Sequence, residues 1–292
     1  MKAARRRLLQ YLGVTLPLSG FCCQQRSRAG ADKSVPRRIV SLSPGTTEIL
    51  FAVGAGDRVV GRSRYCDYPP EVSAIPIVGG FVDASLEEIV RLAPDLVVGA
   101  RGPSGPSLVQ KLDSLGIATL FPPAQSIAEI HEAIAQIAAR VGTNDRGAGV
   151  VASMHARVKA IAARVAHEPR VRALLVFGLS PIVVAGPASF PNEMLELANG
   201  ENVMRSGGAY PAINAETLVT LDPDVVIDGA VGSTGRDAGA IDRDAPAWRE
   251  LRAVRQGRVV LLTDEAALRP GPRFADGVAT IARMLHPDVP LP

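Results

Sequence analysis

The side chains best suited to hold a ligand are aromatic and lie in loops. The chain has one Trp, four Tyr and seven Phe among 292 residues, so their placement is informative. Tyr65, Tyr68, Phe81 and Tyr210 fall near strand ends or before helices, outside periodic apolar runs. Rings in such loops line the clefts of open α/β sheets and hold broad apolar ligands. We therefore predict ligand binding at Tyr65, Phe81 and Tyr210. Packing is the alternative for each and the preferred interpretation for Tyr68.

Two carboxylates suggest a second surface. Glu87 and Glu216 occupy equivalent places in a segment that occurs twice, each in the first turn of a predicted helix. An acid there faces the positive end of the helix dipole, so helix stabilisation alone explains both. One carboxylate on each of two similar lobes also suits a two-subunit partner that offers arginines. We favour docking.

Patterns for catalysis or metal binding are missing from the sequence. The four histidines are scattered, and no His-Glu-x-x-His or Cys-x-x-Cys occurs. The glycine-rich stretches 102–106 and 232–235 lack the lysine and spacing of a phosphate loop, and Gly-x-Ser-x-Gly is absent. We predict no catalytic residue, no metal site and no cofactor, and hence no enzyme; an exported enzyme that uses the same cleft remains the alternative.

The repeated segment predicts the fold that positions these side chains. Residues 85–98 return as residues 214–227, sharing Glu, a Val three positions later, Leu-x-Pro-Asp and an apolar run. Each copy predicts a capped helix, a turn and a buried strand. Upstream, apolar strands ending in Leu-Ser-Pro open both halves, and each is expected to lead to a helix. We predict two pseudo-symmetric α/β lobes with central parallel sheets and a ligand cleft between them.

One long helix is predicted between the lobes. Residues 144–166 contain no proline, and apolar residues recur at spacings of three and four. The domain boundaries that follow are 1–36 for an export signal and linker, 37–142 for the first lobe, 143–168 for the helix and 169–292 for the second lobe. A single stiff helix resists wide hinge closure, so we expect the lobes to move little on binding.

Charge and the N-terminus indicate export. The net charge of +3 comes from basic residues crowded before residue 34, so nothing suggests nucleic-acid binding. A basic start precedes a short apolar stretch, as in a signal peptide, and Arg5-Arg6-Arg7-Leu8 resembles the twin-arginine pattern. Ala29-Gly30-Ala31 has the form of a cleavage site, whereas Cys22 or Cys23 would allow a lipid anchor. A disordered basic tail is the alternative. We expect the periplasm or the outer face of the cytoplasmic membrane.

Several segments resemble one family over nearly the whole chain. They are Ile39-Val40-Ser41-Leu42-Ser43-Pro44 through Glu48, Tyr65-Cys66-Asp67-Tyr68-Pro69, both Leu-x-Pro-Asp copies, and Arg269-Pro270-Gly271-Pro272-Arg273. The chain resembles the helical-backbone class of ABC-importer substrate-binding proteins, which serves cobalamin, siderophores and haem, and most resembles its cobalamin-binding branch.

This resemblance implies roles for individual residues. Tyr65 matches an aromatic against the corrin ring, and Phe81 and Tyr210 match tryptophans that line the cleft. Glu87 and Glu216 match carboxylates that dock on permease arginines. A ligand-contacting segment is matched by Asp264, Glu265, Ala266, Ala267 and Leu268. Phe81 and Tyr210 reduce the aromatic area and the last loop lacks the family's aromatics, which puts the identity of the tetrapyrrole in doubt.

The expected function is therefore capture of a corrinoid, cobalamin or cobinamide, and its delivery to an ABC permease, by a protein we expect to be monomeric. Haem or a ferric siderophore is the alternative within the class. Haem would need a tyrosine or histidine ligand, for which Tyr65 or Tyr210 could serve. An anionic siderophore would need arginines in the cleft, and Arg269 and Arg273 are the obvious supply.

Overall fold

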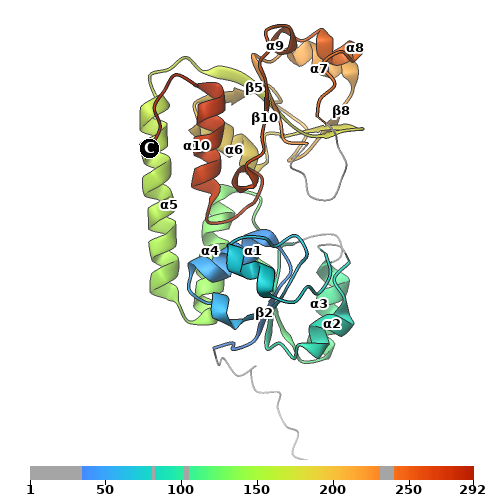
Figure 1. Cartoon of the computed structure of the whole chain (residues 1–292), viewed down its shortest axis with the longest axis vertical. Coiled ribbons are helices and arrows are strands. Elements are labelled where there is room, and N and C mark those ends of the chain that lie inside the picture. The colour runs from blue at the N-terminus through green and yellow to red at the C-terminus, as the bar shows by residue number, and fades with distance from the viewer. Residues whose placement is uncertain (1–34, 81–82, 102–104, 231–239) are drawn as a thin grey trace, which may run out of the picture. The chain divides into compact units, whose positions relative to one another are not determined.

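The computed structural model describes residues 35–80, 83–101, 105–230 and 240–292, and two separate β-sheets with flanking helices make up this part of the chain (Figure 1). The first sheet is wholly parallel, in the order β2-β1-β3-β4. Its strands are β1 (Ile39–Ser41), β2 (Val59–Arg62), β3 (Leu96–Val98) and β4 (Ala118–Leu120). Every residue of β1 and β3 is buried, as expected of parallel strands covered on both faces.

Helices alternate with these strands along the chain. They are α1 (Pro44–Ala52), α2 (Leu86–Arg91), α3 (Gly105–Ser114) and α4 (Ile127–Val141), with the 3-10 turns η1 (Gly56–Arg58) and η2 (Pro70–Ala74). Strands β1–β4 and helices α1–α4 are called the first lobe below.

The second sheet has the order β10-β9-β5-β6-β8, with β7 paired to β5. Its strands are β5 (Val171–Leu179), β6 (Ile182–Val184), β7 (Gly200–Asn202), β8 (Ala212–Ile213), β9 (Val225–Asp228) and β10 (Val259–Leu261). Its helices are α6 (Phe190–Leu197), α7 (Ala215–Leu221), α8 (Pro246–Arg249), α9 (Arg252–Arg255) and α10 (Phe274–Leu285), with the 3-10 turn η3 (Glu265–Ala267). These elements form the second lobe.

The two Leu-Ser-Pro segments differ in structure. In the first lobe Ser43 is the residue before α1, as the sequence predicts. In the second lobe Ser180 and Pro181 instead form the turn of a hairpin, because β5 continues to Leu179 and pairs antiparallel with β6. The helix start expected at Glu193 in this half is confirmed, because α6 covers Phe190–Leu197. The antiparallel pairs β5–β6 and β6–β8 therefore extend an otherwise parallel sheet.

The duplicated segment builds the same structure twice. Ser85 accepts a hydrogen bond from the Glu88 backbone N–H at the start of α2, and Asn214 accepts one from Thr217 at the start of α7. At the far end of each helix an arginine of the adjacent strand region donates to the last carbonyls. Arg38 donates to Leu92 and Ala93, and Arg172 donates to Leu221 and Asp222. Asp95 and Asp224 then accept from the backbone N–H groups of those same arginines. This confirms that the repeat is structural.

A single helix, α5 (Asn144–Val165), follows α4 after Gly142, whose φ of +74° ends α4 in the left-handed region. Its 22 residues span about 33 Å at 1.5 Å per residue. The helix packs against α4 of the first lobe and α10 of the second (Figure 1). Met154, Ile161 and Val165 are buried on the apolar face that the sequence pattern predicts. The prediction of one long helix joining two lobes is confirmed.

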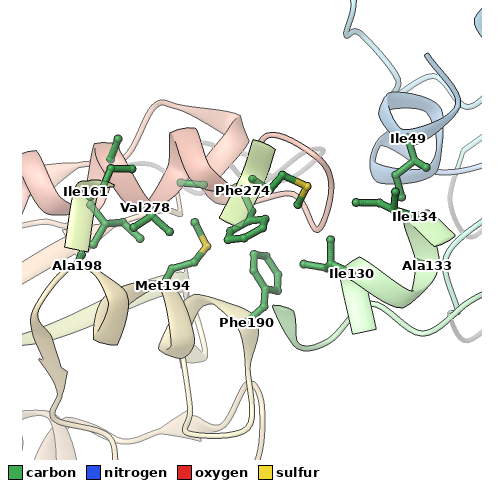
Figure 2. Close-up of a cluster of buried hydrophobic side chains, with 14 of the residues drawn as sticks. Ile49, Ile130, Ala133, Ile134, Ile161, Phe190, Met194, Ala198, Phe274 and Val278 are labelled. Carbon is green, nitrogen blue, oxygen red and sulfur yellow. The ribbon is translucent and has the colours of Figure 1, made fainter. Parts of the chain in front are cut away.

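The hydrophobic core is continuous from one lobe to the other. Ile49 of α1 lies near Ile134 of α4, and Ile130 of α4 points toward Phe190 of α6 and Phe274 of α10 (Figure 2). All five are buried. The lobes are therefore held by shared apolar packing as well as by α5. Within the described ranges, no helix combines the length and apolar character that crossing a bilayer requires.

Candidate functional site

Tyr65 lies in the loop after β2, beside a charged pair. The Arg64 guanidinium lies 5.9 Å from the centroid of the Tyr65 ring and forms an ion pair with Asp83 at 2.8 Å. Hydrogen bonding to Asp83 raises the pKa of Arg64. The Asp83 carboxylate and the Tyr65 ring also lie close to Gly80, where a Cβ would press on both side chains. Tyr65 is half-buried, and one face of the loop therefore presents an aromatic ring next to a cation.

Phe81, the third predicted aromatic, follows Gly80 directly and lies outside the described residues, as does the side chain of Glu265.

Tyr210 lies in the second lobe just before β8. Its ring meets that of Phe177 edge to face, with centroids 5.4 Å apart and an interplanar angle of 82°. The residue is 46% exposed, yet surrounding atoms shield the phenol enough to raise its pKa to about 12. Tyr210 thus offers an exposed ring with a neutral hydroxyl at physiological pH.

The loop 264–268 is tied to its own lobe. The Asp264 carboxylate accepts hydrogen bonds from the Thr280 hydroxyl at 2.7 Å and from the Ala266 backbone N–H at 2.9 Å. The side chains of Ala266 and Ala267 are buried, and Leu268 is half-buried. A ligand that contacts this loop would therefore touch the Leu268 side chain, the accessible part of the Asp264 carboxylate or the backbone.

The two arginines suggested for an anionic ligand are paired with carboxylates of the first lobe. The Glu48 carboxylate accepts from Arg273 Nε at 3.0 Å and from Arg273 Nη2 at 2.7 Å. Arg269 pairs with both oxygens of Asp67, through Nη1 and, at 2.9 Å, through Nη2. Sequence reasoning assigned no role to Glu48 or Asp67. A signal was present for Glu48, because it is a charged residue directly before the apolar run Ile49-Leu50-Phe51-Ala52 of α1.

A hollow of about 350 Å³ lies beside this region, between α5, η3 and α10. It is lined by Arg157, Asp264, Ala266, Arg273, Asp276, Ala279, Thr280 and Arg283. Its charges are largely satisfied internally, since Arg157 pairs with Asp276 and Asp264 accepts from Thr280. Two predicted ligand residues, Asp264 and Ala266, line it, whereas Tyr65 and Tyr210 do not. This polar hollow therefore does not match an aromatic site for a broad apolar ligand.

The predicted docking carboxylates are both exposed. Glu87 and Glu216 are the second residues of α2 and α7. Neither carboxylate forms a hydrogen bond or ion pair within the part of the chain that the structure describes, whereas the neighbouring Glu88 pairs with Arg91. Three positions after each, Val90 and Val219 are 41% and 40% exposed. Each lobe thus presents a carboxylate and an apolar side chain on one helix face.

Histidine and acidic side chains do not gather into a metal site in the described ranges. His131 of α4 and His155 of α5 stack with ring centroids 4.3 Å apart, and the His131 ring also contacts Phe274. The two rings pack α4 against α5 and do not form a set of metal ligands.

Sequence and structure comparisons agree on one kind of protein. The family described as "Periplasmic binding protein" matches residues 39–266. The chain is 31% identical over 263 residues to the uncharacterized ABC transporter substrate-binding lipoprotein YvrC of Bacillus subtilis, covering 88% of this chain and 82% of that protein. It is 34% identical over 191 residues to the vitamin B12-binding protein of Salmonella typhimurium, covering 65% of this chain and 71% of that protein. A periplasmic heme-binding protein from Pseudomonas aeruginosa has the same fold, with a TM-score of 0.78 at 26% identity over 88% of this chain and 95% of that one.

Proposed function

The chain belongs to the periplasmic binding protein family, and from this membership we propose that it captures a corrinoid outside the cytoplasmic membrane and delivers it to an ABC permease. The family consists of solute-binding proteins, and the class to which this chain belongs serves cobalamin, haem and siderophores. Within that class, the choice of ligand depends on what the loops of the two lobes offer.

The pairing of Arg269 and Arg273 is the observation that carries this choice. A carboxylate-rich or phenolate-rich siderophore needs cations that are free to pair with it. Here both guanidinium groups already pair with Glu48 and Asp67 of the first lobe. A neutral or weakly charged ligand held by aromatic rings fits these loops better than an anionic siderophore.

The state of Tyr210 supports a corrinoid over haem. A tyrosine binds ferric iron as the phenolate, and a phenol with a pKa raised to about 12 gives up its proton reluctantly. An exposed, neutral ring suits stacking against a macrocycle. Haem is the second candidate, favoured by Tyr65, a half-buried tyrosine in the loop after β2 that could offer its phenol oxygen to ferric iron.

Delivery would use Glu87 and Glu216. Their carboxylates are exposed, matched between lobes and without partners in the described part of the chain, as contacts to permease arginines require. Export through an N-terminal signal of the twin-arginine type would place the protein in the periplasm or on the outer face of the cytoplasmic membrane, where it would act as a monomer.

Calorimetric titration of the purified chain with cyanocobalamin, dicyanocobinamide, haemin and a ferric hydroxamate tests the proposal. Saturable binding of either corrinoid, tighter than that of haemin and of the hydroxamate, is expected. Binding of haemin alone, with an absorption band of ferric tyrosinate that Tyr65→Phe removes, would establish the second candidate instead. Failure of both corrinoids to bind would reject the proposed ligand.

A further inference from the structure

Three segments that are distant in sequence meet where the second lobe touches the first. They are the start of α1 with Gly45 and Glu48, the loop 65–69 after β2, and the loop 269–273 before α10. The last segment belongs to the second lobe and the other two to the first. We call this meeting point the clasp.

Glu48 is the centre of the clasp. Its side chain is 2% exposed, and both of its oxygens accept hydrogen bonds from the Arg273 guanidinium. Arg269 Nη1 lies 3.8 Å from the same carboxylate, and the Arg269 side chain is 8% exposed. Charges this far from water depend on their partners, because removing one partner leaves the other buried and uncompensated.

The loop that bears Tyr65 is held by the same two arginines. Arg269 pairs with Asp67, two residues after Tyr65, and the Arg273 guanidinium lies 3.9 Å from the centroid of the Tyr68 ring. On the other side, Arg269 directly follows Leu268, the end of the predicted ligand loop 264–268. Each arginine therefore links a candidate ligand loop of one lobe to a candidate ligand loop of the other.

Backbone packing brings the segments close enough for these pairs. A Cβ on Gly45 would lie under 3.0 Å from the Pro270 carbonyl oxygen, closer than real side chains approach. A Cβ on Gly271 would already touch the Gly45 Cα. Glycine at position 45 therefore lets the loop 269–273 lie directly on the start of α1.

We propose that Arg269 and Arg273 are positioning residues that fix the Tyr65 loop of the first lobe relative to the 264–268 loop of the second before any ligand arrives. Preorganised surfaces bind without the cost of ordering loops. The clasp itself is independent of what the protein binds; only its effect on ligand affinity rests on the proposed function.

Cys66 provides a direct measure of the clasp. It lies between Tyr65 and Asp67, is 1% exposed, and its sulfur accepts a hydrogen bond from the Thr47 hydroxyl at 3.1 Å. Burial raises the pKa of its thiol, so the native loop should react slowly with thiol reagents. Release of the loop would expose the sulfur and speed the reaction.

The experiment uses the full chain with Cys22→Ser and Cys23→Ser, which leaves Cys66 as the single thiol. The rate of reaction with DTNB at pH 8 is compared for this background and for Arg269→Gln, Arg273→Gln and Glu48→Gln. Each clasp variant should react about tenfold faster or more, because local opening controls access to the sulfur. Arg157→Gln, which breaks the exposed Arg157–Asp276 pair between α5 and α10, outside the three segments of the clasp, is the matched control and should react at the background rate.

Two further variants separate positioning from general damage. Arg273→Lys keeps the charge and should restore part of the protection; it carries the test if Arg273→Gln does not fold. Glu48→Gln combined with Arg273→Gln should react less fast than the product of the two single effects, since the residues act as one unit. A double variant whose rate increase equals the product of the two single increases would overturn the clasp. Unchanged reaction rates in variants that remain folded by circular dichroism would overturn it as well.

Ligand affinity forms the second arm of the experiment. Arg269→Gln and Arg273→Gln should weaken cyanocobalamin binding about tenfold by calorimetry, with Arg157→Gln unchanged. Unaltered affinity in variants whose Cys66 has become reactive would refute the positioning role. If the unmodified chain binds no corrinoid, the proposed function fails while the Cys66 rates still decide whether the clasp exists.

Discussion

Glu87 and Glu216 occupy the same position in two helices built from the same repeated segment. Each is the second residue of its helix, two positions after the capping side chain of Ser85 or Asn214. Each is followed three residues later by an exposed valine. Helix capping needs only the residue before the helix, and Ser85 and Asn214 already meet that need. Neither glutamate is needed for capping, so both carboxylates are available for docking on a partner.

Replacing both glutamates should separate ligand capture from delivery. In Glu87→Ala/Glu216→Ala each lost helix-dipole contact costs about 0.3–1 kcal/mol, so the protein should stay folded. Contacts with permease arginines should lose about 2–5 kcal/mol when one partner is truncated. We expect unchanged ligand affinity by calorimetry and loss of uptake in cells that carry the variant. Glu71→Ala/Glu168→Ala, exposed carboxylates outside α2 and α7, serve as the control. Normal uptake in the first variant would leave both glutamates with a structural role only.

The aromatic loops should contribute to binding through their rings. Tyr65→Ala and Tyr210→Ala should each weaken corrinoid binding by about 0.5–1.5 kcal/mol beyond the lost area. Tyr210→Phe should bind like the unmodified chain, because the ring is retained and the phenol is neutral. A large loss in Tyr210→Phe would instead assign the hydroxyl a direct contact. Calorimetry with cyanocobalamin measures all three.

The histidine pair predicts a loss of stability in mild acid. Burial, and then the neighbouring His155, lower the pKa of His131 below its usual 6.5, and its Nε2 is buried without a partner in the described part of the chain. The unfolded chain therefore binds a proton at a higher pH than the native state does. Stability should begin to fall as pH drops through about 6.5 and stop falling below the native pKa.

Urea unfolding at pH 7.5 and pH 5.0 measures this effect. His131→Gln should reduce the difference in unfolding free energy between the two pH values, whereas His167→Gln, an exposed residue after α5, should preserve it. An equal difference in all three proteins would show that His131 does not control acid stability.

Two glycine substitutions should change the unfolding free energy in opposite directions. Gly45→Ala pushes a methyl group against Pro270 and should lower the unfolding free energy by about 1–3 kcal/mol. Gly149→Ala lies in α5 with no atom near its Cβ and should raise it by about 0.4–1 kcal/mol. Thermal unfolding of both variants checks the signs. A neutral Gly45→Ala would mean that the loop 269–273 yields without cost.

Local sequence patterns predicted the elements well and their long-range contacts poorly. The apolar spacing of Met154, Ile161 and Val165 predicts α5 because helix periodicity is a local property. The Leu-x-Pro-Asp repeat predicts both helix–turn–strand units for the same reason. The Leu-Ser-Pro letters alone do not predict the hairpin at Ser180–Pro181, because strand pairing decides whether the chain turns back there.

The clasp could not be predicted from such patterns. Its ion pairs join residues 202 and 225 positions apart, and no local rule pairs Asp67 with Arg269 or Glu48 with Arg273. From the sequence, both arginines could be named only as the obvious supply of cations for an anionic siderophore. The ligand residues and the domain boundaries stay predictions, and Phe81 lies outside the described residues.

The great sequence separation across the clasp also orders events during synthesis. A chain made from its N-terminus presents Glu48 and Asp67 more than 200 residues before Arg269 and Arg273 emerge. Until then, the Glu48 carboxylate, which is buried in the folded protein, lacks its arginine partners. Such long-range contacts form late and slowly. The nascent protein therefore acquires its mature arrangement only after the loop that bears Arg269 and Arg273 has been made.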